Sequence, residues 1–171
     1  NHSSAASDVY KRQVLDGVGD TFQYVHEYNL STPYDISTRT YAGNDERCEL
    51  GSGSDGHSGN QAHDLEFSND GMKLFTSDKS TDTLFRFDLT SPYDVSTCSF
   101  VYETTTVDTP ALQNGSNAGE KGTNTRLQGF EISEDGKKLF LLFHDSGGDP
   151  SRLHEYNLST PFDLRTLSLV T

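Results

Sequence analysis

The stretch HEYNLSTP at residues 26–33 occurs a second time, unchanged, at residues 154–161. From its Asn-Leu onward, each copy continues as a longer segment, which reads NLSTPYDIST in the first case and NLSTPFDLRT in the second. A related segment, LFRFDLTSPYDVST, occupies residues 84–97 between them. The three copies align on their proline. Repetition of a segment along a chain is typical of an architecture built from repeated structural units.

A second repeated element precedes two of these copies. AHDLEFSNDGMKLF at residues 62–75 matches LQGFEISEDGKKLF at residues 127–140. The alternating segments DLEFS and GFEIS are typical of half-buried β-strands. The Asp-Gly that follows each of them indicates a tight hairpin, because glycine accepts the positive φ that such turns need. MKLFTSD and KKLFLLFHD are then predicted to return as second strands.

The repeated stretch itself predicts a third strand, a turn and a fourth strand. Apolar side chains alternate in TLFRFDL at residues 83–89, and YVHEYNL and RLHEYNL show the same alternation at residues 24–30 and 152–158. Ser-Pro-Tyr-Asp at residues 91–94 predicts a type I turn, because proline presets φ at its second position. The fourth strand is clearest in CSFVYETTTV at residues 98–107.

Four antiparallel strands per unit, repeated with short turns, predict an all-β fold. The expected architecture is a fragment of a β-propeller with about two and a half four-stranded antiparallel blades. A string of separate small sheets is the alternative, but each sheet would leave an apolar face and open edges uncovered. We divide the chain into a partial blade plus long loop at residues 14–61, a blade plus long loop at 62–126, and a blade truncated at its last strand at 127–171.

Residues 1–13 are left out of this division. SSAASDVYKRQ at residues 3–13 resembles the in-frame translation of a transposase-type sequencing adapter. We interpret residues 1–13 as a non-native, adapter-derived tail, and a natural disordered N-terminus is the alternative. This interpretation implies a metagenome sequence. Propellers close with about four to eight blades, so the smaller number of repeat units in this chain predicts that it is a fragment of a longer protein.

Composition restricts the partners that the chain could have. Its formal net charge of −13 disfavours nucleic acid, whose phosphates attract basic patches, and disfavours anionic membrane surfaces. No apolar run approaches the roughly 20 residues of a membrane span. Cys48 and Cys98 could form one inter-blade disulfide, which would indicate an oxidising compartment. They could equally remain free thiols.

Two long segments, residues 42–61 and 106–126, separate the units and are rich in Gly, Ser, Asn and Thr. Insertions on one face of a repeat protein often form its binding face. The residues that open the first strands are expected on the same face, beside a central channel. We therefore predict a ligand-binding surface that contains Asp45, Glu46, Asp55, His57, His63, Asp64, Lys121, Asn124, Arg126 and Gln128.

The same residues are the candidates for metal binding and for catalysis. His57, His63 and Asp64 carry donor atoms that suit zinc or manganese. The second unit has Gln128 and Gly129 instead of a repeated ligand set, so no cofactor is expected and a divalent metal stays the alternative. The sequence contains no G-x-S-x-G, Walker, dinucleotide or HExxH motif, and no catalytic residue is predicted.

The pair His-Glu in HEYNL also has a structural interpretation. His26-Glu27 and His154-Glu155 lie on a repeated strand and alternate in the direction they face. The middle copy has Phe85-Arg86 at this position. A structural role is therefore expected for both pairs.

These segments carry a family resemblance over about residues 22–171. The Asp-Gly hairpin followed by NLSTPYDIST, LTSPYDVST or NLSTPFDLRT resembles YVTN-like and WD-repeat-like propeller repeats. More closely, it resembles the DLST…DVST repeats in proteins of marine bacteria and their phages. The chain departs from that pattern by having Pro-Tyr or Pro-Phe where those repeats often have Ala-Trp. The resemblance implies an extracellular, periplasmic or virion-associated β-propeller, and no particular reaction.

Two functions follow as hypotheses. The favoured one is a non-catalytic β-propeller repeat segment of a larger secreted or virion-associated protein, which binds a protein or glycan ligand through long inter-blade loops. Its partners would then include the remaining blades of its own parent chain, but neither nucleic acid nor membrane. The alternative is a lactonase- or gluconolactonase-like hydrolase with a metal site at the propeller channel mouth. That alternative depends on a weaker resemblance, carried by the Asp-Gly-x-Lys hairpin alone.

Overall fold

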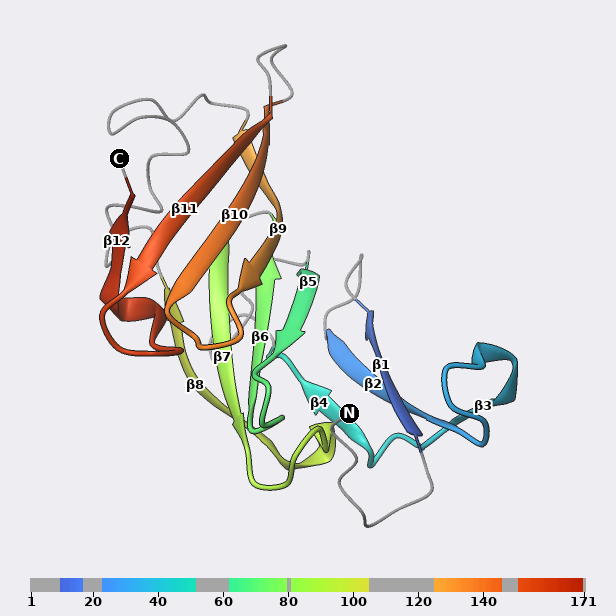
Figure 1. Ribbon diagram of the computed structural model, residues 1–171. Helices are drawn as coiled ribbons and strands as arrows, with labels where there is room; N and C mark the ends of the chain where they lie inside the picture. The colour runs from blue at the N-terminus through green and yellow to red at the C-terminus, as the bar shows by residue number, and fades with distance from the viewer. Residues whose placement is uncertain are drawn as a thin grey trace.

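The computed structural model describes residues 10–16, 23–51, 62–79, 81–104, 125–145 and 151–170. Within these residues the chain forms three four-stranded antiparallel sheets (Figure 1). Short 3-10 turns are the only helical segments in this part of the chain. No described helix is long and apolar enough to cross a membrane. The all-β prediction is confirmed.

Each sheet is one unit of the repeat and is called a blade below. Blade 1 contains β1 (Tyr10–Asp16), β2 (Tyr24–Leu30), β3 (Arg39–Tyr41) and β4 (Arg47–Glu49), and both β3 and β4 pair with β2. Blade 2 contains β5 (Ala62–Phe67), β6 (Lys73–Asp78), β7 (Thr83–Leu89) and β8 (Cys98–Thr104) in that spatial order. Blade 3 contains β9 (Thr125–Ile132), β10 (Lys138–Asp145), β11 (Arg152–Leu158) and β12 (Leu167–Leu169), also in that order.

The three blades share one strand register. In each blade a lysine of the second strand faces the penultimate residue of the third strand: the pairs are Lys11–Asn29, Lys73–Asp88 and Lys138–Asn157. β1 therefore holds the second-strand position of blade 1, and its residues 10–13, which sequence analysis left out of the fold, pair with β2. Of residues 11–13 only Lys11 matches the repeat, because Arg12 and Gln13 stand where β6 has Leu74 and Phe75.

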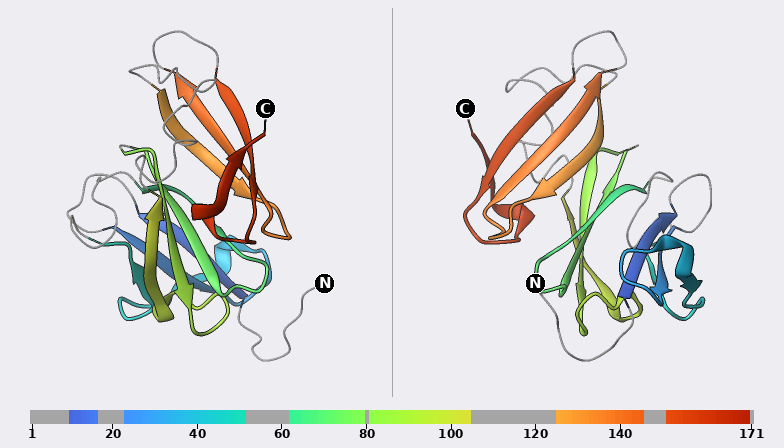
Figure 2. Two further views of the ribbon diagram at one scale, coloured as in Figure 1. Left: turned by 90° about the vertical axis from the view of Figure 1, so that its left-hand side faces the viewer. Right: turned by 45° about the vertical axis from the view of Figure 1, so that its right-hand side comes forward.

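The blades stack face to face (Figure 2). One buried cluster joins blades 1 and 2 and includes Val25, Leu50, Phe85 and Phe87. A second cluster joins blades 2 and 3 and includes Phe75, Leu84, Tyr102, Leu141, Tyr156 and Leu164. The alternation along β7 explains both clusters, since Phe85 and Phe87 face blade 1 while Leu84 faces blade 3.

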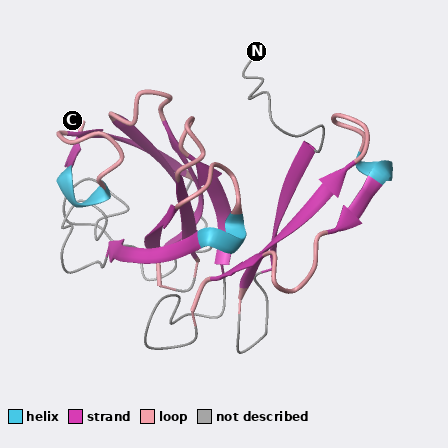
Figure 3. Ribbon diagram, turned by 90° about the horizontal axis from the view of Figure 1, so that it is seen from below, coloured by secondary structure: helices cyan, strands magenta, loops and turns pink. Residues whose placement is uncertain are grey.

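This packing excludes the alternative of separate small sheets. Seen from below, the three sheets lie one beside the next, with the C-terminal blade and blade 1 at opposite ends (Figure 3). β5, the first strand of blade 2, lies beside β9, the first strand of blade 3. Four-stranded antiparallel sheets stacked with their first strands together are consecutive blades of a β-propeller. The chain is a β-propeller fragment.

The repeated Asp and Thr of the opening stretch build a turn between the third and fourth strands. Each Asp caps a 3-10 turn by accepting a hydrogen bond from the amide two residues later; Asp94 Oδ1, for example, accepts from Ser96 N at 3.2 Å. Thr97 Oγ1 accepts from the amides of Thr90 and Ser91 at 3.2 and 3.3 Å. The stretch recurs because every blade needs this same connection, as its polar side chains satisfy the backbone groups of the turn.

The predicted type I turn at residues 91–94 is wrong. Tyr93 has φ 59°, and Tyr34 and Phe162 at the equivalent positions have φ 60°, whereas type I turns need negative φ there. Bulky residues avoid positive φ. Here the ring of Tyr93 lies on Gly71, where a Cβ would stand 2.4 Å from its Cδ2, and Tyr93 N donates to Gly71 O at 2.8 Å. Packing on the hairpin glycine offsets the backbone cost.

Cys48 and Cys98 form a disulfide whose Cα atoms lie 5.7 Å apart. The bond joins β4 of blade 1 to the start of β8 of blade 2. The sequence alone left the pairing of these cysteines open. The structure shows the inter-blade disulfide.

Candidate functional site

Two of the predicted binding residues, His63 and Gln128, occupy equivalent bulges. The register of β5 on β6 shifts between Ala62 and Asp64, and that of β9 on β10 shifts between Leu127 and Gly129. His63 and Gln128 are therefore extra residues near the start of each first strand. A bulge interrupts pairing and redirects a side chain. The His63 side chain is exposed and that of Gln128 is half-buried.

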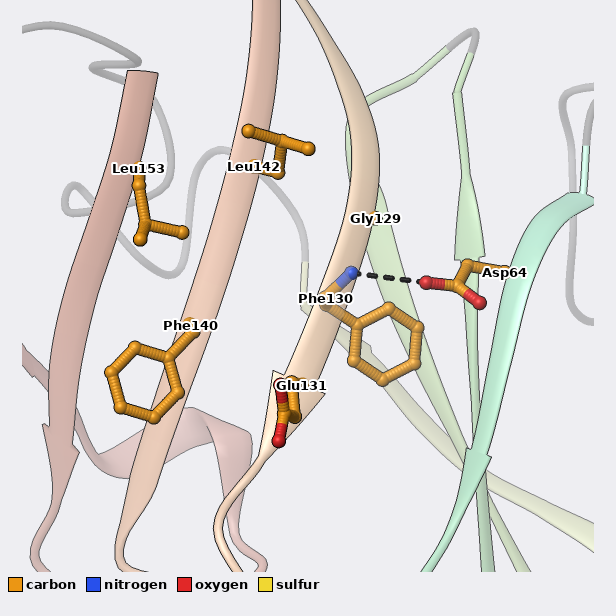
Figure 4. Close-up of a pocket in the computed structure, with 7 residues that line it drawn as sticks. All are labelled: Asp64, Gly129, Phe130, Glu131, Phe140, Leu142 and Leu153. Atoms are coloured by element: carbon orange, nitrogen blue, oxygen red, sulfur yellow. Dashed lines mark hydrogen bonds between the residues drawn. The ribbon is translucent and has the colours of Figure 1, made fainter. Parts of the chain in front are cut away.

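Asp64 is committed to a contact between blades. Its Oδ1 accepts a hydrogen bond from Leu65 N at 2.9 Å, and its Oδ2 accepts one from Phe130 N on β9 at 3.1 Å (Figure 4). Gly129 makes room for this approach, since a Cβ there would stand 3.2 Å from Oδ2. Both carboxylate oxygens of Asp64, a predicted ligand-binding residue, thus accept hydrogen bonds from backbone amides.

Glu66, two residues further along β5, repeats the contact. Its Oε2 accepts a hydrogen bond from Ile132 N on β9 at 2.8 Å. β9 is the edge strand of blade 3, so its outward amides have no ladder partner of their own. Asp64 and Glu66 supply the missing acceptors.

A further pair of contacts links successive blades at the start of each first strand. Gln23 Oε1 accepts from Ala62 N at 2.9 Å, and Asp82 Oδ1 accepts from Leu127 N at 2.8 Å. Gln23 and Asp82 each stand directly before the third strand of their blade. Neither residue was predicted from the sequence. Their shared position before YVHEYNL and TLFRFDL was the available signal, but different residue types hid it.

Carboxylates gather along these inner strands and alter the protonation of Glu66. The pKa of Glu66 is raised from its ordinary value of 4.5 to about 7, mainly by burial and in smaller part by the charges of Glu131 and Asp64, while the hydrogen bond from the Ile132 amide lowers it. Glu66 therefore binds a proton near neutral pH while it accepts the hydrogen bond from Ile132.

Replacing Glu66 with glutamine is expected to stabilise the protein in a pH-dependent way. The folded pKa of about 7 lies above the ordinary value of 4.5, so stability from protonated Glu66 is complete below pH 4.5 and is lost as pH rises through 7. Glutamine keeps an acceptor for Ile132 and does not ionise. After allowance for solvent screening of this half-exposed group, Glu66→Gln should gain about 1 to 2 kcal/mol of unfolding free energy at about pH 8.5 and almost none at about pH 4.

Urea unfolding of both proteins at the two pH values measures this difference. Glu134→Gln is the control, because the Glu134 side chain is exposed in the hairpin turn of blade 3 and its charge is not among those that act on Glu66. A gain of equal size at both pH values would show that the ionisation of Glu66 is not its cause.

The structure describes three of the other seven predicted residues. Asp45 and Glu46 lie in the turn between β3 and β4, which together form the outer strand of blade 1, so the predicted loop at 42–61 starts too early. Arg126, assigned to the second long loop, lies in β9 opposite His144. The remaining four, Asp55, His57, Lys121 and Asn124, lie outside the described residues.

Among the described residues no group of three or more His, Cys, Asp and Glu side chains is placed to hold a metal ion. His57, one of the predicted donors, lies outside them. His26 Nδ1 lies 3.1 Å from Tyr41 Oη, and Glu27 is paired with Lys11 at 2.8 Å, so both residues make contacts within blade 1.

A hollow of about 230 Å³ lies on the outer face of blade 3 (Figure 4). It is lined by Asp64, Gly129, Phe130, Glu131, Phe140, Leu142 and Leu153. Asp64 is the one predicted binding residue in this lining, and its oxygens already bind backbone amides. The lining is mainly apolar and offers few groups that could orient a polar ligand.

The long connections leave and enter the sheets at one end. Because the strands of a blade alternate in direction, β8 ends at the same end of the molecule at which β9 begins, as Figure 1 shows. We call this end the entry face and define it by Gln23, His63, Asp82 and Gln128. Segments 52–61 and 105–124 connect to the blades there.

The fold of the chain is similar to that of proteins with solved structures. The chain aligns with a protein from Lactobacillus plantarum with a TM-score of 0.54 at 13% identity, over 95% of this chain and 41% of that one. A putative 6-phosphogluconolactonase from Bacteroides fragilis NCTC 9343 gives a TM-score of 0.49 at 12% identity, over 94% and 41%. The Pseudomonas aeruginosa periplasmic gluconolactonase PpgL gives 0.49 at 15% identity, over 86% and 37%.

At these identities the likeness concerns the fold alone. The chain spans about 40% of the length of the proteins it matches. No protein-family model matches the sequence, and no curated protein does so either.

Proposed function

We propose that the chain is a non-catalytic β-propeller repeat segment of a larger protein that binds a protein or glycan ligand at the entry face, through segments 52–61 and 105–124. One observation carries this proposal. Three acidic groups that an enzyme could use for chemistry hold the blades together: Asp64 and Glu66 on β5 and Asp82 before β7 each accept a hydrogen bond from the backbone of β9. The loops are then the part of the chain whose sequence can vary without disturbing the contacts between blades. Loops of this kind are where scaffold folds acquire binding sites.

The proposed location and partners follow from two further features. The inter-blade disulfide supports an oxidising location, which is extracellular, periplasmic or on a virion. The net charge of −13 supports a partner other than nucleic acid or an anionic membrane. YVTN-like repeats of marine bacterial and phage proteins remain the proposed family.

Binding to a glycan array, with the loops replaced one at a time, tests the proposal. Segments 53–60 and 106–123 are each replaced by a short Gly-Ser linker in the full chain. The unaltered chain should bind one class of glycan, and at least one replacement should weaken that binding by about tenfold or more. Lys137→Ala is the control, because Lys137 is exposed in the hairpin turn at the opposite end of blade 3. Glycan binding that survives both replacements would contradict the proposal, as would the absence of any glycan or protein ligand.

The hydrolase alternative keeps one favourable observation, the exposed His63 at a bulge beside Asp64. Calorimetric titration with calcium, zinc and manganese, followed by an assay of sugar-lactone hydrolysis, separates the two functions. Stoichiometric metal uptake and turnover that both fall in His63→Ala would support the hydrolase. Neither is expected.

A further inference from the structure

The outer strand of blade 2, β8, has one edge without a strand partner. β8 pairs with β7 on its inner side, and no other described strand pairs with it. Blade 2 has a described blade packed on each of its faces, so this edge lies on the side of the stack and not at either end of it. The backbone N–H and C=O groups along such an edge are able to pair with another chain.

β8 lacks most of the features by which proteins protect an edge strand. Its sequence, CSFVYET, contains no lysine, arginine or proline, and the strand is seven residues long. The outer strand of blade 1 is instead broken into β3 and β4, of three residues each, and both carry an arginine. Short strands, positive charges and proline discourage pairing with a further chain. Blade 1 therefore has a protected outer edge, whereas that of blade 2 is open.

A bulge in β8 presents two apolar side chains to solvent. The register of β8 on β7 shifts between Arg86 and Phe87, and Val101 is the extra residue that no residue of β7 faces. Phe100 is 40% exposed and Val101 is 42% exposed. The ring of Phe100 contacts that of the buried Phe87 edge-on, with centroids 5.7 Å apart. An added strand would remove this apolar surface from water.

The charge of β8 indicates the chemistry of the strand that would be added. Glu103 is the one charged residue of β8, and none of the described ion pairs includes it. Across the ladder, Phe100 pairs with Phe87, and Glu103 pairs with Phe85. Both of these partners belong to the cluster between blades 1 and 2, so Phe100 and Glu103 lie on the same side of the sheet. An unpaired carboxylate on a chain of net charge −13 favours a basic side chain beside it.

We propose that the outer edge of β8 binds an extended peptide of a partner protein as an added strand of blade 2, with an apolar side chain against Phe100 and a basic side chain beside Glu103. This site is separate from the entry face, because Phe100 lies near the start of β8 and β8 ends at the entry face. Residues 105–124 connect to β8 at that far end, which favours a partner over this segment as the occupant. Because a single added strand is a small interface, the binding is weak and reversible.

Fluorescence anisotropy of a labelled synthetic peptide, Thr-Val-Thr-Lys-Thr-Val-Thr-Lys, titrated with the full chain, tests this proposal. Valine and lysine alternate on one face of this peptide when it is extended. An apolar and a basic side chain therefore meet Phe100 and Glu103 in either strand direction. We expect saturable binding, and the same peptide with glutamate in place of lysine should bind at least about tenfold more weakly.

Two substitutions on β8 test the contacts. Phe100→Lys and Glu103→Lys should each weaken binding of the lysine peptide by about tenfold or more, because each removes one contact and adds a repelling charge. Glu134→Lys is the matched control, since it makes the same charge change as Glu103→Lys at an exposed hairpin residue of blade 3. It should change binding by less than about twofold. Thermal unfolding confirms that each variant folds.

Hydrogen exchange measured by NMR locates the bound peptide. At saturation, the amides of β8 that point away from β7 should become protected, whereas exchange along β3 should not change. Absence of binding, or binding that all three substitutions weaken equally, would overturn the proposal. Binding that appears only after residues 106–123 are replaced by a Gly-Ser linker would overturn it too, because this segment of the chain itself would then be the occupant.

Discussion

Replacing Cys48 and Cys98 together with alanine is expected to lower the free energy of unfolding by about 2 to 4 kcal/mol. The disulfide joins residues separated by 50 positions and ties blade 1 to blade 2. Without it, the unfolded chain regains the freedom of a long loop, while the folded chain loses the cross-link between β4 and β8. The shift should appear as a lower urea midpoint.

The reduced protein is the natural control for this substitution. Unaltered chain treated with a thiol reductant should unfold at nearly the same urea concentration as the double alanine variant, because both lack the same constraint. An oxidised chain no more stable than the variant would contradict the disulfide and, with it, the placement of β4 against β8.

Replacing Phe75 with alanine is expected to cost about 3 to 5 kcal/mol of unfolding free energy. Phe75 is fully buried between blades 2 and 3 and stacks on Phe162. The substitution removes this contact and leaves a cavity that the surrounding strands fill only in part. Chemical unfolding monitored by circular dichroism measures the loss.

Phe140→Ala is the matched control for that experiment. Phe140 holds the same repeat position on blade 3, where it is only half-buried because no described blade covers it. In dilute solution its replacement should cost about 1 kcal/mol. Equal losses at the two positions would indicate that blade 3 does not cover blade 2.

The strands were predictable because local signals specify them. The alternation in TLFRFDL and the Asp-Gly of each hairpin are properties of short segments, and the repeats show them more than once. β4 was missed because the outer strand of blade 1 is interrupted, and three residues, Arg47–Glu49, give no periodic pattern. The turn at Tyr93 was misassigned because its conformation depends on Gly71, which lies far back in the chain.

The candidate site was less predictable for a related reason. The sequence indicated correctly that His63 and Asp64 lie at the start of β5, whereas β9 begins at Thr125, three residues before Gln128. It could not indicate that Asp64 bonds to Phe130 on the next blade. Contacts between blades depend on how the sheets stack, and single polar residues such as Gln23 and Asp82 give no periodic signal. Because of those contacts, we interpret the acidic residues of β5 as parts of the scaffold and not as ligand-binding groups.

Hydrogen exchange of three β9 amides, followed residue by residue with NMR, tests the stacking of blade 3 on blade 2 most directly. The amides of Leu127, Phe130 and Ile132 point away from blade 3 and are bonded only to Asp82, Asp64 and Glu66 of blade 2. Consecutive stacked blades predict that all three exchange at least about a hundredfold more slowly than in an unstructured peptide. Exchange at the unprotected rate, with the amides bonded to β10 still protected, would contradict the stacked propeller and leave separate sheets in its place.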